Sequence, residues 1–140
     1  KSLSRRLNTF NSTAFRVLYA PDYQTFVTNF ILTDRQHPLY PIMVRRNEER
    51  KKEGIWWHVT TTNDLSKSSV VRSWCRRRLR NAFTDALKTR GFDRFGRLVD
   101  AGALEVPFRS LANVVKDKPD FQLRGSFRFH AQVPVIPAKY

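Results

Sequence analysis

The stretch from Ser66 to Gly91 constrains the fold more than any other part of the sequence. Its apolar residues recur at intervals of three and four positions, which places them on one side of an α-helix. Ser68 or Ser69 can cap the N-terminus of such a helix, and Gly91 suits the position just past its C-terminus. We therefore expect one long amphipathic helix over about residues 68–90. Its apolar face is predicted to contain Val71, Cys75, Leu79, Ala82, Phe83, Ala86 and Leu87.

This predicted helix is also the most basic part of the chain. Residues 66–90 hold eight Lys and Arg side chains and one acid, Asp85, so the segment carries half of the chain's net charge of +14. A solvated helix face normally mixes both signs, because opposite charges four positions apart stabilise a helix. Closely spaced arginines repel one another unless an anion lies against them, so the helix is predicted to present a nucleic-acid surface. We expect four bases opposite the apolar face and two at its borders: Arg76, Arg77, Arg80 and Lys88, then Arg72 and Arg78.

The composition of the whole chain also points to a polyanionic partner. The 140 residues carry 26 Lys and Arg against 12 Asp and Glu, and the pI is about 10.9. Eighteen of the basic residues are Arg, whose forked guanidinium group binds phosphate oxygens in pairs and stacks on bases. A hydrophobic content of 41% indicates a folded chain, and the length is that of one domain.

The sequence lacks the residue patterns of common catalytic and metal sites. Its single cysteine, Cys75, excludes an internal disulfide and a Cys-based zinc site, and its three histidines show no paired-ligand spacing. Gly91 and Gly96 have the spacing of P-loop glycines, but Arg97 and Leu98 stand where that motif needs Lys and Ser or Thr. No apolar run approaches the ~20 residues of a transmembrane helix. We therefore expect no catalytic residue, metal site, cofactor, small-molecule substrate or transmembrane segment.

The rest of the sequence predicts a small sheet packed against this helix. Aromatic, β-branched or alternating apolar residues predict strands over residues 14–19, 55–62 and 126–133, and a shorter one over 103–106. Short helices are expected over residues 21–33 and 107–117, although the Val, Thr, Phe and Ile content of the first also allows a strand. Two prolines predict a loop over residues 34–44, and mixed charges predict a solvated turn over 45–53. The expected fold is α+β, with a basic, irregular N-terminal arm over 1–13, one domain over 14–133 and an extended tail over 134–140.

The period of two in a strand predicts which side chains share a face. In the strand from residue 55, Ile55, Trp57 and Val59 share one face, and Trp56, His58 and Thr60 share the other. We expect one Trp in the core and the other either over a second layer or stacked on a base. In the last strand, Phe127, Phe129, Ala131 and Val133 are expected to point inward, and Arg128, His130 and Gln132 outward.

Within the predicted helix, the run from Val70 to Phe83, VVRSWCRRRLRNAF, resembles the signature of the bacterial ribonuclease P protein subunit. In that family a strand precedes a helix reading Val-Val-Arg-Asn-Arg-x-Lys-Arg-Arg-Leu-Arg-Glu-Ala-Phe, and residues 55–62 match the strand. Ser73 and Trp74 depart from the signature, because they replace its central Asn and Arg. The resemblance implies a small α/β sandwich whose basic helix lies against RNA. The matching bases are Arg72, Arg76, Arg77, Arg78 and Arg80.

The chain as a whole resembles the lineage-specific proteins of organellar ribosomes, such as those of fungal mitochondria. An Arg-rich domain of this size carries this resemblance, together with extended ends and a first 20 residues that hold four bases and no acid. Such a basic, acid-free leader resembles the remnant of a mitochondrial transit segment, and a basic arm that penetrates RNA would have the same composition.

The resemblance implies a non-catalytic constituent of the mitochondrial ribosome, located in the matrix and bound to rRNA and neighbouring ribosomal proteins. Three alternatives stay open. They are an RNA-processing factor of the ribonuclease P type that binds precursor tRNA or a catalytic RNA, a DNA-binding protein, and a peripheral membrane protein. The predicted RNA-binding residues are Arg5, Arg6, Arg45, Arg46, Lys51, Lys52, Arg72, Arg76, Arg77, Arg78, Arg80 and Lys88.

Overall fold

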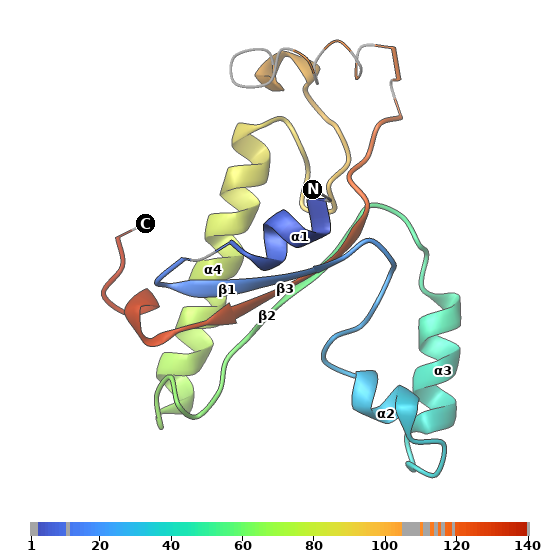
Figure 1. Cartoon of the computed structure of the whole chain (residues 1–140), viewed down its shortest axis with the longest axis vertical. Helices are drawn as coiled ribbons and strands as arrows, with labels where there is room; N and C mark the ends of the chain where they lie inside the picture. The colour runs from blue at the N-terminus through green and yellow to red at the C-terminus, as the bar shows by residue number, and fades with distance from the viewer. Residues whose placement is uncertain are drawn as a thin grey trace.

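Helices and strands combine in an α+β fold in the computed structural model (Figure 1). It describes residues 3–10, 12–104, 110, 113, 115, 117, 118 and 120–139. A three-stranded sheet lies at the centre, one long helix covers one of its faces, and two short helices form a lobe beside it (Figure 1). The predicted α+β class, with a small sheet against a long basic helix, is therefore confirmed.

The sheet places the last strand in the middle. Its order is β1 (Phe15–Ala20), β3 (Gly125–Ala131) and β2 (Ile55–Thr60). β3 pairs antiparallel with β1 and parallel with β2. A parallel pair needs a long crossover, which here includes the long helix α4 (Ser69–Thr89). The three longer predicted strands are confirmed to within two residues at each end.

The core lies between α4 and the face of the sheet that it covers. At the centre of the sheet, Phe129 of β3 lies opposite Val17 of β1 and Val59 of β2. All three are buried in one cluster with Cys75 and Leu79 of α4. Burying large apolar side chains is the main favourable term in folding, so this contact fixes the position of α4 on the sheet.

Most of the predicted inward positions are confirmed, and two are wrong. Cys75 is 0% exposed, and burial raises the pKa of its thiol, although the positive charge of Arg78 acts in the opposite direction. Ala86 is exposed, because it lies beyond the part of the helix surface that the sheet covers. Val133 is 56% exposed, because β3 ends at Ala131 and the chain turns into a 3₁₀-helix, η2 (Val133–Val135).

The ends of α4 carry the caps that the sequence predicts. The Ser68 hydroxyl accepts a hydrogen bond from the Val71 amide at 3.5 Å, so Ser68 is the N-cap. At the other end, Gly91 adopts a φ of 81°, its amide donates to the Lys88 carbonyl, and the Phe92 amide donates to Leu87. This paired arrangement is a Schellman motif, and it requires the left-handed conformation at Gly91.

The lobe corrects the prediction for residues 21–53. The helix expected over 21–33 is confined to α2 (Asn29–Thr33), and the expected loop and turn contain a ten-residue helix, α3 (Tyr40–Glu49). Pro41 lies in the first turn of α3, where the amide that proline lacks would have no helical partner. Proline therefore begins this helix instead of excluding one.

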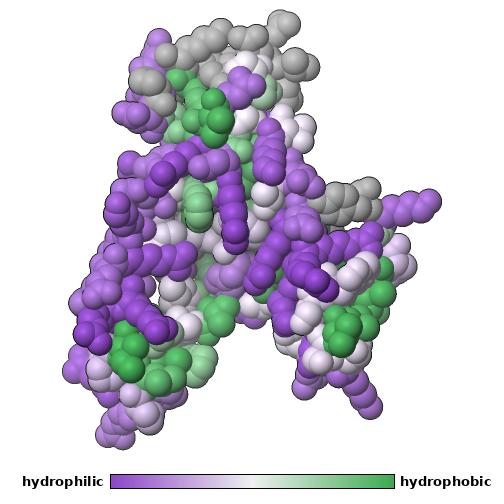
Figure 2. Space-filling model, turned by 180° about the vertical axis from the view of Figure 1, so that it is seen from behind, coloured by the Kyte–Doolittle hydropathy of each residue, from purple (hydrophilic) through white to green (hydrophobic). Residues whose placement is uncertain are grey.

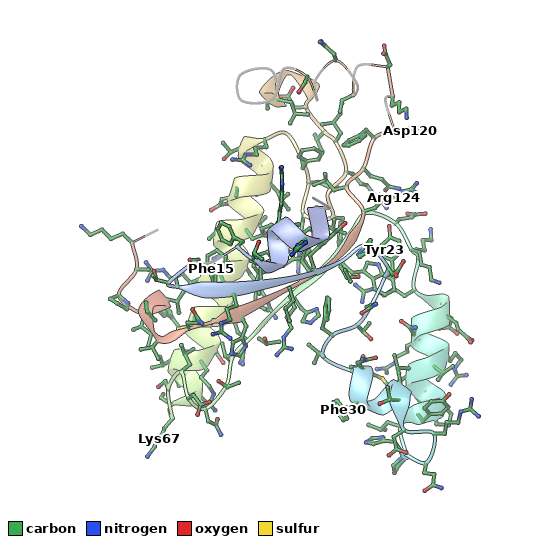
Figure 3. All side chains as sticks on the ribbon, in the orientation of Figure 1. Phe15, Tyr23, Phe30, Lys67, Asp120 and Arg124 are labelled. Atoms are coloured by element: carbon green, nitrogen blue, oxygen red, sulfur yellow. The ribbon has the colours of Figure 1, made fainter. Side chains whose placement is uncertain are left out.

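A short segment ties the lobe to the far face of the sheet. Ser126 is 0% exposed, and its hydroxyl donates to the Asp22 carbonyl at 2.7 Å and accepts from the Gln24 amide at 2.7 Å. The Tyr23 ring, where the chain leaves the sheet, lies 5.0 Å from the ring of Trp56 (Figure 3). Trp56 is 4% exposed and is covered by this segment. It therefore packs against a second layer, which is one of the two roles expected for the Trp outside the main core.

Both ends of the described chain are more ordered than the sequence suggests. Residues expected to be irregular form the short helix α1 (Leu3–Asn8). The C-terminal tail follows η2 back onto the molecule, and Val135 is buried in the main core.

The region after α4 differs in part from the prediction. In place of the strand expected over 103–106, the chain forms a 3₁₀-helix, η1 (Ala101–Leu104), and residues 105 and 106 lie outside the described part. The helix expected over 107–117 also lies mostly outside the described residues.

Candidate nucleic-acid interface

Three cations of α4 extend into solvent. Arg77, Arg80 and Lys88 are all exposed. Within the described ranges, no acidic side chain pairs with any of them; the ion pair between Arg97 and Glu53, at 2.9 Å, lies outside this helix. Their positive charge is therefore available to an anion, as a phosphate contact requires.

The other three arginines of the predicted surface are half-buried and make internal hydrogen bonds. Arg72 donates to the Ser66 carbonyl at 2.7 Å, and Arg76 donates to the Thr61 hydroxyl at 2.9 Å. Arg78 donates to two carbonyls of the C-terminal tail. These guanidinium groups hold the segments on either side of α4, so only part of each is left for an RNA phosphate.

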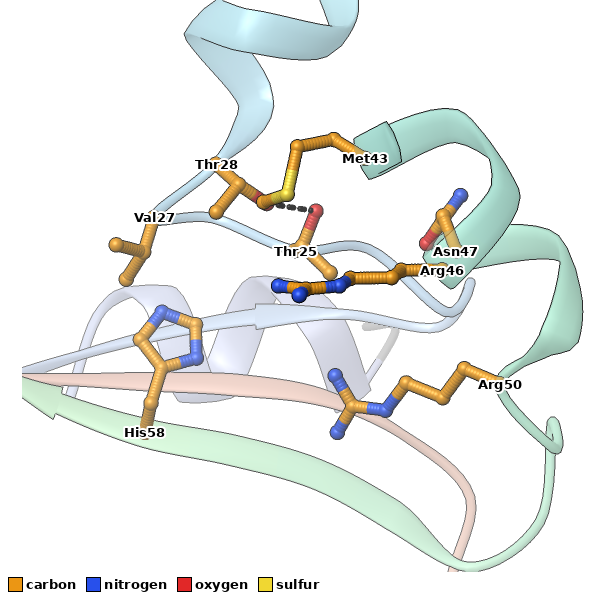
Figure 4. A pocket seen from close by; sticks show the side chains of 8 residues that line it. All are labelled: Thr25, Val27, Thr28, Met43, Arg46, Asn47, Arg50 and His58. Carbon is orange, nitrogen blue, oxygen red and sulfur yellow. Dashed lines mark hydrogen bonds between the residues drawn. The ribbon is translucent and has the colours of Figure 1, made fainter. Parts of the chain in front are cut away.

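The helix α3 adds a second row of cations. Arg45 and Arg46 are exposed on α3, and Arg50, Lys51 and Lys52 are exposed just after it. Arg46 and Arg50 are four positions apart, which is the spacing that places two side chains on the same side of a helix. Both of these guanidinium groups, from Arg46 and Arg50, extend toward the side of the sheet that bears His58 (Figure 4). Arg50 also lies 3.9 Å over the ring of Trp56, and burial lowers its pKa.

The face of the sheet that α4 does not cover lies on the side of α3. Hydrophilic side chains line the hollow between the α2–α3 lobe and the rest of the molecule (Figure 2). Here Arg128 donates to the Thr60 hydroxyl at 3.1 Å, and that hydroxyl lies 3.0 Å from Nδ1 of His130. The far face of the sheet is therefore polar and basic at this point, next to the edge strand β2.

The histidines on this face have a lowered pKa. The pKa of His58 is lowered first by burial and then by the charges of Arg128, Arg50 and Arg80. The pKa of His130 is lowered by burial and by two arginines, with a weaker opposite effect from an aspartate. Charges from β3, α3 and α4 thus create a positive potential at His58, where an anion would be stabilised.

The structure brings together some of the predicted residues and separates others. Arg46 extends toward the far face of the sheet from α3, and Arg80 lies on α4, which covers the other face, although its charge still acts on His58. Arg77 and Lys88 occupy the outer side of α4. Arg5 and Arg6 are exposed on α1, which lies along β1, the edge opposite to β2 (Figure 1). The predicted cations therefore surround the sheet and do not form one patch.

Sequence reasoning missed Arg50, Arg128 and His58 as parts of a basic site. The alternation in β2 and β3 does place His58 and Arg128 on the outer face of each strand. Their proximity depends on the pairing of these strands, which puts His58 directly opposite Arg128. Strand pairing between segments 70 residues apart leaves no local signal in the sequence.

The chain matches no protein-family model, no curated protein and no solved structure. No helix among the described residues has both the length and the apolar character needed to span a membrane. Nor do three or more His, Cys, Asp or Glu side chains gather as metal ligands in this part of the chain.

Proposed function

We propose that this chain binds RNA as a non-catalytic, structural constituent of the mitochondrial ribosome. In this proposal it lies in the mitochondrial matrix, contacts rRNA through the cations of α4 and α3, and contacts neighbouring ribosomal proteins through its apolar surface. The proposal joins the resemblance of the sequence to organellar ribosomal proteins with the distribution of charge on the folded chain.

The observation that carries the RNA part of the proposal is the set of exposed cations without acidic partners. Arg77, Arg80 and Lys88 on α4, and Arg45 and Arg46 on α3, pair with no acid among the described residues. α4 has six basic residues and one acidic residue, Asp85, so its like charges repel one another and a phosphate backbone beside the helix lowers that repulsion.

Two further features favour a ribosomal protein over a factor with a single RNA-binding face. Cations occur at both edges of the sheet, as suits a protein with RNA on several sides. The lobe exposes three apolar side chains: Phe30, which projects from α2 (Figure 3), is 65% exposed, Leu39 49% and Ile42 41%. Exposed apolar side chains on one lobe fit contact with another protein.

The alternative is an RNA-processing factor that resembles the ribonuclease P protein subunit and binds precursor tRNA or a catalytic RNA. One observation favours it: the run from Val70 to Phe83 lies on α4, directly after strand β2, in the order that the resemblance implies. Two of the five matching bases, Arg77 and Arg80, are exposed.

The salt dependence of RNA binding tests the interface. Replacing Arg77 and Arg80 together by Gln removes two exposed charges and should leave the folding stability nearly unchanged. We expect weaker binding to RNA and a slope of log affinity against log salt that is flatter by roughly 1.4–1.8, from about 0.7–0.9 per phosphate contact. The matched control replaces Arg94 and Arg124, which are exposed elsewhere, and should retain most of the slope. Equal losses in both double variants would contradict an interface on α4.

Sedimentation of the wild-type chain in a mitochondrial lysate distinguishes the structural role from the RNA-processing role. Stoichiometric co-migration of the wild-type chain with one ribosomal subunit at high salt supports the structural role. Migration as a small complex, with selective binding to precursor tRNA, would instead support the processing factor.

A further inference from the structure

A pocket lies between the lobe and the far face of the sheet, away from the outer side of α4. Its volume is about 280 Å³, close to the lower end of the roughly 300–1,000 Å³ typical of ligand sites. Arg46, Asn47 and Arg50 line it from α3, and His58 lines it from β2 (Figure 4).

Two buried polar atoms in this pocket lack a partner. Oδ1 of Asn47 and Nε2 of His58 are both inaccessible to solvent, and neither forms a hydrogen bond with any described residue. Buried polar atoms are almost always paired, because an unpaired one costs free energy. Both residues line the same pocket, so a small turn of each side chain would bring these two atoms within reach of one ligand placed there.

The charge of the pocket selects an anion. Two guanidinium groups, from Arg46 and Arg50, extend into the pocket, and no acidic side chain of the described ranges lines it or pairs with them. Arg128, on the neighbouring strand and directly opposite His58, adds to the same potential. Arginine pairs of this kind bind phosphate in a fixed geometry.

A free phosphate ion can donate an O–H group, but it makes no match for the apolar side chains of the pocket. Oδ1 of Asn47 accepts hydrogen bonds and cannot donate them, so the ligand needs an N–H or O–H donor there. Val27, from the segment before α2, and Met43, from α3, add apolar surface to the pocket (Figure 4). A nucleotide supplies all three features, since it has a phosphate, a flat apolar ring and, in adenine, guanine and cytosine, an amino group.

We infer that this pocket takes one unstacked nucleotide of a bound RNA strand. Its phosphate lies on Arg46 and Arg50, its base lies against Val27 and Met43, and a base amino group donates to Oδ1 of Asn47. The strand source follows from the surroundings, because α4 packs on β2, the strand that bears His58, and Arg76 of α4 donates to the Thr61 hydroxyl just after β2. A backbone held by the cations of α4 can thus continue into the pocket. This inference rests on the proposed function, since it assumes that the chain binds RNA.

The test uses the full chain and a short single-stranded RNA that carries one 2-aminopurine, whose fluorescence reports unstacking. The variants are Arg46→Gln and Asn47→Leu, and the control is Arg45→Gln, which removes the same charge from an exposed neighbour in α3 that does not line the pocket. The NMR signals of the His58 ring provide a second measurement on the wild-type chain alone.

We expect the wild-type chain to bind the RNA, shift the His58 signals and increase the 2-aminopurine fluorescence. Arg46→Gln and Asn47→Leu should each reduce the affinity for RNA about tenfold and abolish the fluorescence increase. Arg45→Gln should reduce the affinity less and should retain the fluorescence increase. Unchanged His58 signals on RNA binding overturn the inference even if Asn47→Leu fails to fold. In that case RNA still binds through α4, so the proposed function stands; no RNA binding at all refutes both.

A further measurement with a free nucleotide distinguishes an RNA strand from a mononucleotide as the ligand of the pocket. Adenosine monophosphate alone should bind the pocket much more weakly than the RNA, since it lacks the contacts to α4. If it shifts the His58 signals and the RNA does not, the pocket is a site for free nucleotides and the strand assignment is overturned.

Discussion

His58 shows how the fold sets the chemistry of a single side chain. Its imidazole is half-buried on β2, with charges from Arg128, Arg50 and Arg80 around it. Burial and like charge both disfavour the protonated ring, so its pKa in the folded chain lies below the ordinary value near 6.5. The folded chain therefore takes up a proton at His58 less readily than the unfolded chain does.

This difference predicts a loss of stability at mildly acidic pH. Well above pH 6.5 the ring is neutral in both states. As the pH falls through about 6.5 the unfolded chain takes up a proton at His58 first, and the folded chain follows only at its lower pKa, so stability is lost between these two pKa values. The free energy of unfolding should therefore decrease between about pH 7 and pH 5, before most carboxylates titrate. Urea unfolding across this range measures the decrease. In His58→Gln it should be smaller, with the remainder from His130, whose pKa is also lowered. An identical decrease in the variant would show that His58 contributes nothing.

The roles of individual arginines on α4 could be predicted only in part. Helical spacing correctly placed Arg77, Arg80 and Lys88 on the solvent side. It could not show that Arg76 reaches the Thr61 hydroxyl or that Arg72 reaches the Ser66 carbonyl. A long side chain at the border of a helix face can turn toward solvent or toward a neighbouring segment, and the choice depends on tertiary structure.

At the scale of elements, the C-terminus of α4 depends on one glycine. Gly91 has a φ of 81°, and a Cβ placed there would meet the Asp100 carbonyl oxygen at 2.0 Å. The amides of both Val99 and Asp100 donate to the Gly91 carbonyl, so the loop after α4 packs tightly against this turn. The glycine therefore permits both the helix end and the return of the chain.

Gly91→Ala should destabilise the chain by at least about 1–2 kcal/mol, because a side chain disfavours the left-handed conformation and the clash adds to this cost. The control is Gly102→Ala. A Cβ at Gly102 would meet only the end of the Asp100 side chain, at 3.2 Å, and its φ lies outside the left-handed region. Urea unfolding of both variants checks the prediction. Similar free energies of unfolding for the two would mean that the turn at Gly91 can relax.

Among the elements, those with a strong local signal were predicted correctly. α4, β2 and β3 have clear periodicity and were placed to within a few residues. α3 was missed, because its mixed charges resemble a solvated turn and its apolar residues form no long stripe. The helix packs beside α2, in the lobe to one side of the sheet (Figure 1), and α2 supplies contacts that the sequence of α3 does not reveal.

At the scale of the whole molecule, the tail closes the core that α4 and the sheet begin. Val135 is buried in the same cluster as Cys75, and Ile136 packs against that cluster. Arg78 holds this segment by donating to the Ile136 carbonyl, at 3.4 Å, and to the Ala138 carbonyl. The sequence predicted an extended tail, but its docking could not be predicted, because it joins residues almost 60 positions apart.

The single cysteine can report whether Arg78 holds the tail. Hydrogen bonds from a charged donor contribute about 1.5–3 kcal/mol each, so Arg78→Gln should open the tail at least about tenfold more often. Because Cys75 lies beneath the tail residues, its thiol should react correspondingly faster with a thiol reagent under native conditions. Arg78 itself acts to lower the pKa of this thiol. Losing its charge alone would therefore slow the reaction, and a faster reaction indicates an open tail.

Two comparisons separate tail release from general loss of stability. Arg77→Gln removes an exposed charge one position away and should leave the labelling rate unchanged. A chain that ends at Gln132 lacks the tail and should label at least as fast as Arg78→Gln. In that shortened chain, adding Arg78→Gln should cause no further increase, because the contact that it removes is already absent. A further increase in the shortened chain would mean that Arg78 protects Cys75 by some route other than the tail. An unchanged labelling rate in full-length Arg78→Gln would mean that the apolar contacts of Val135 hold the tail without Arg78.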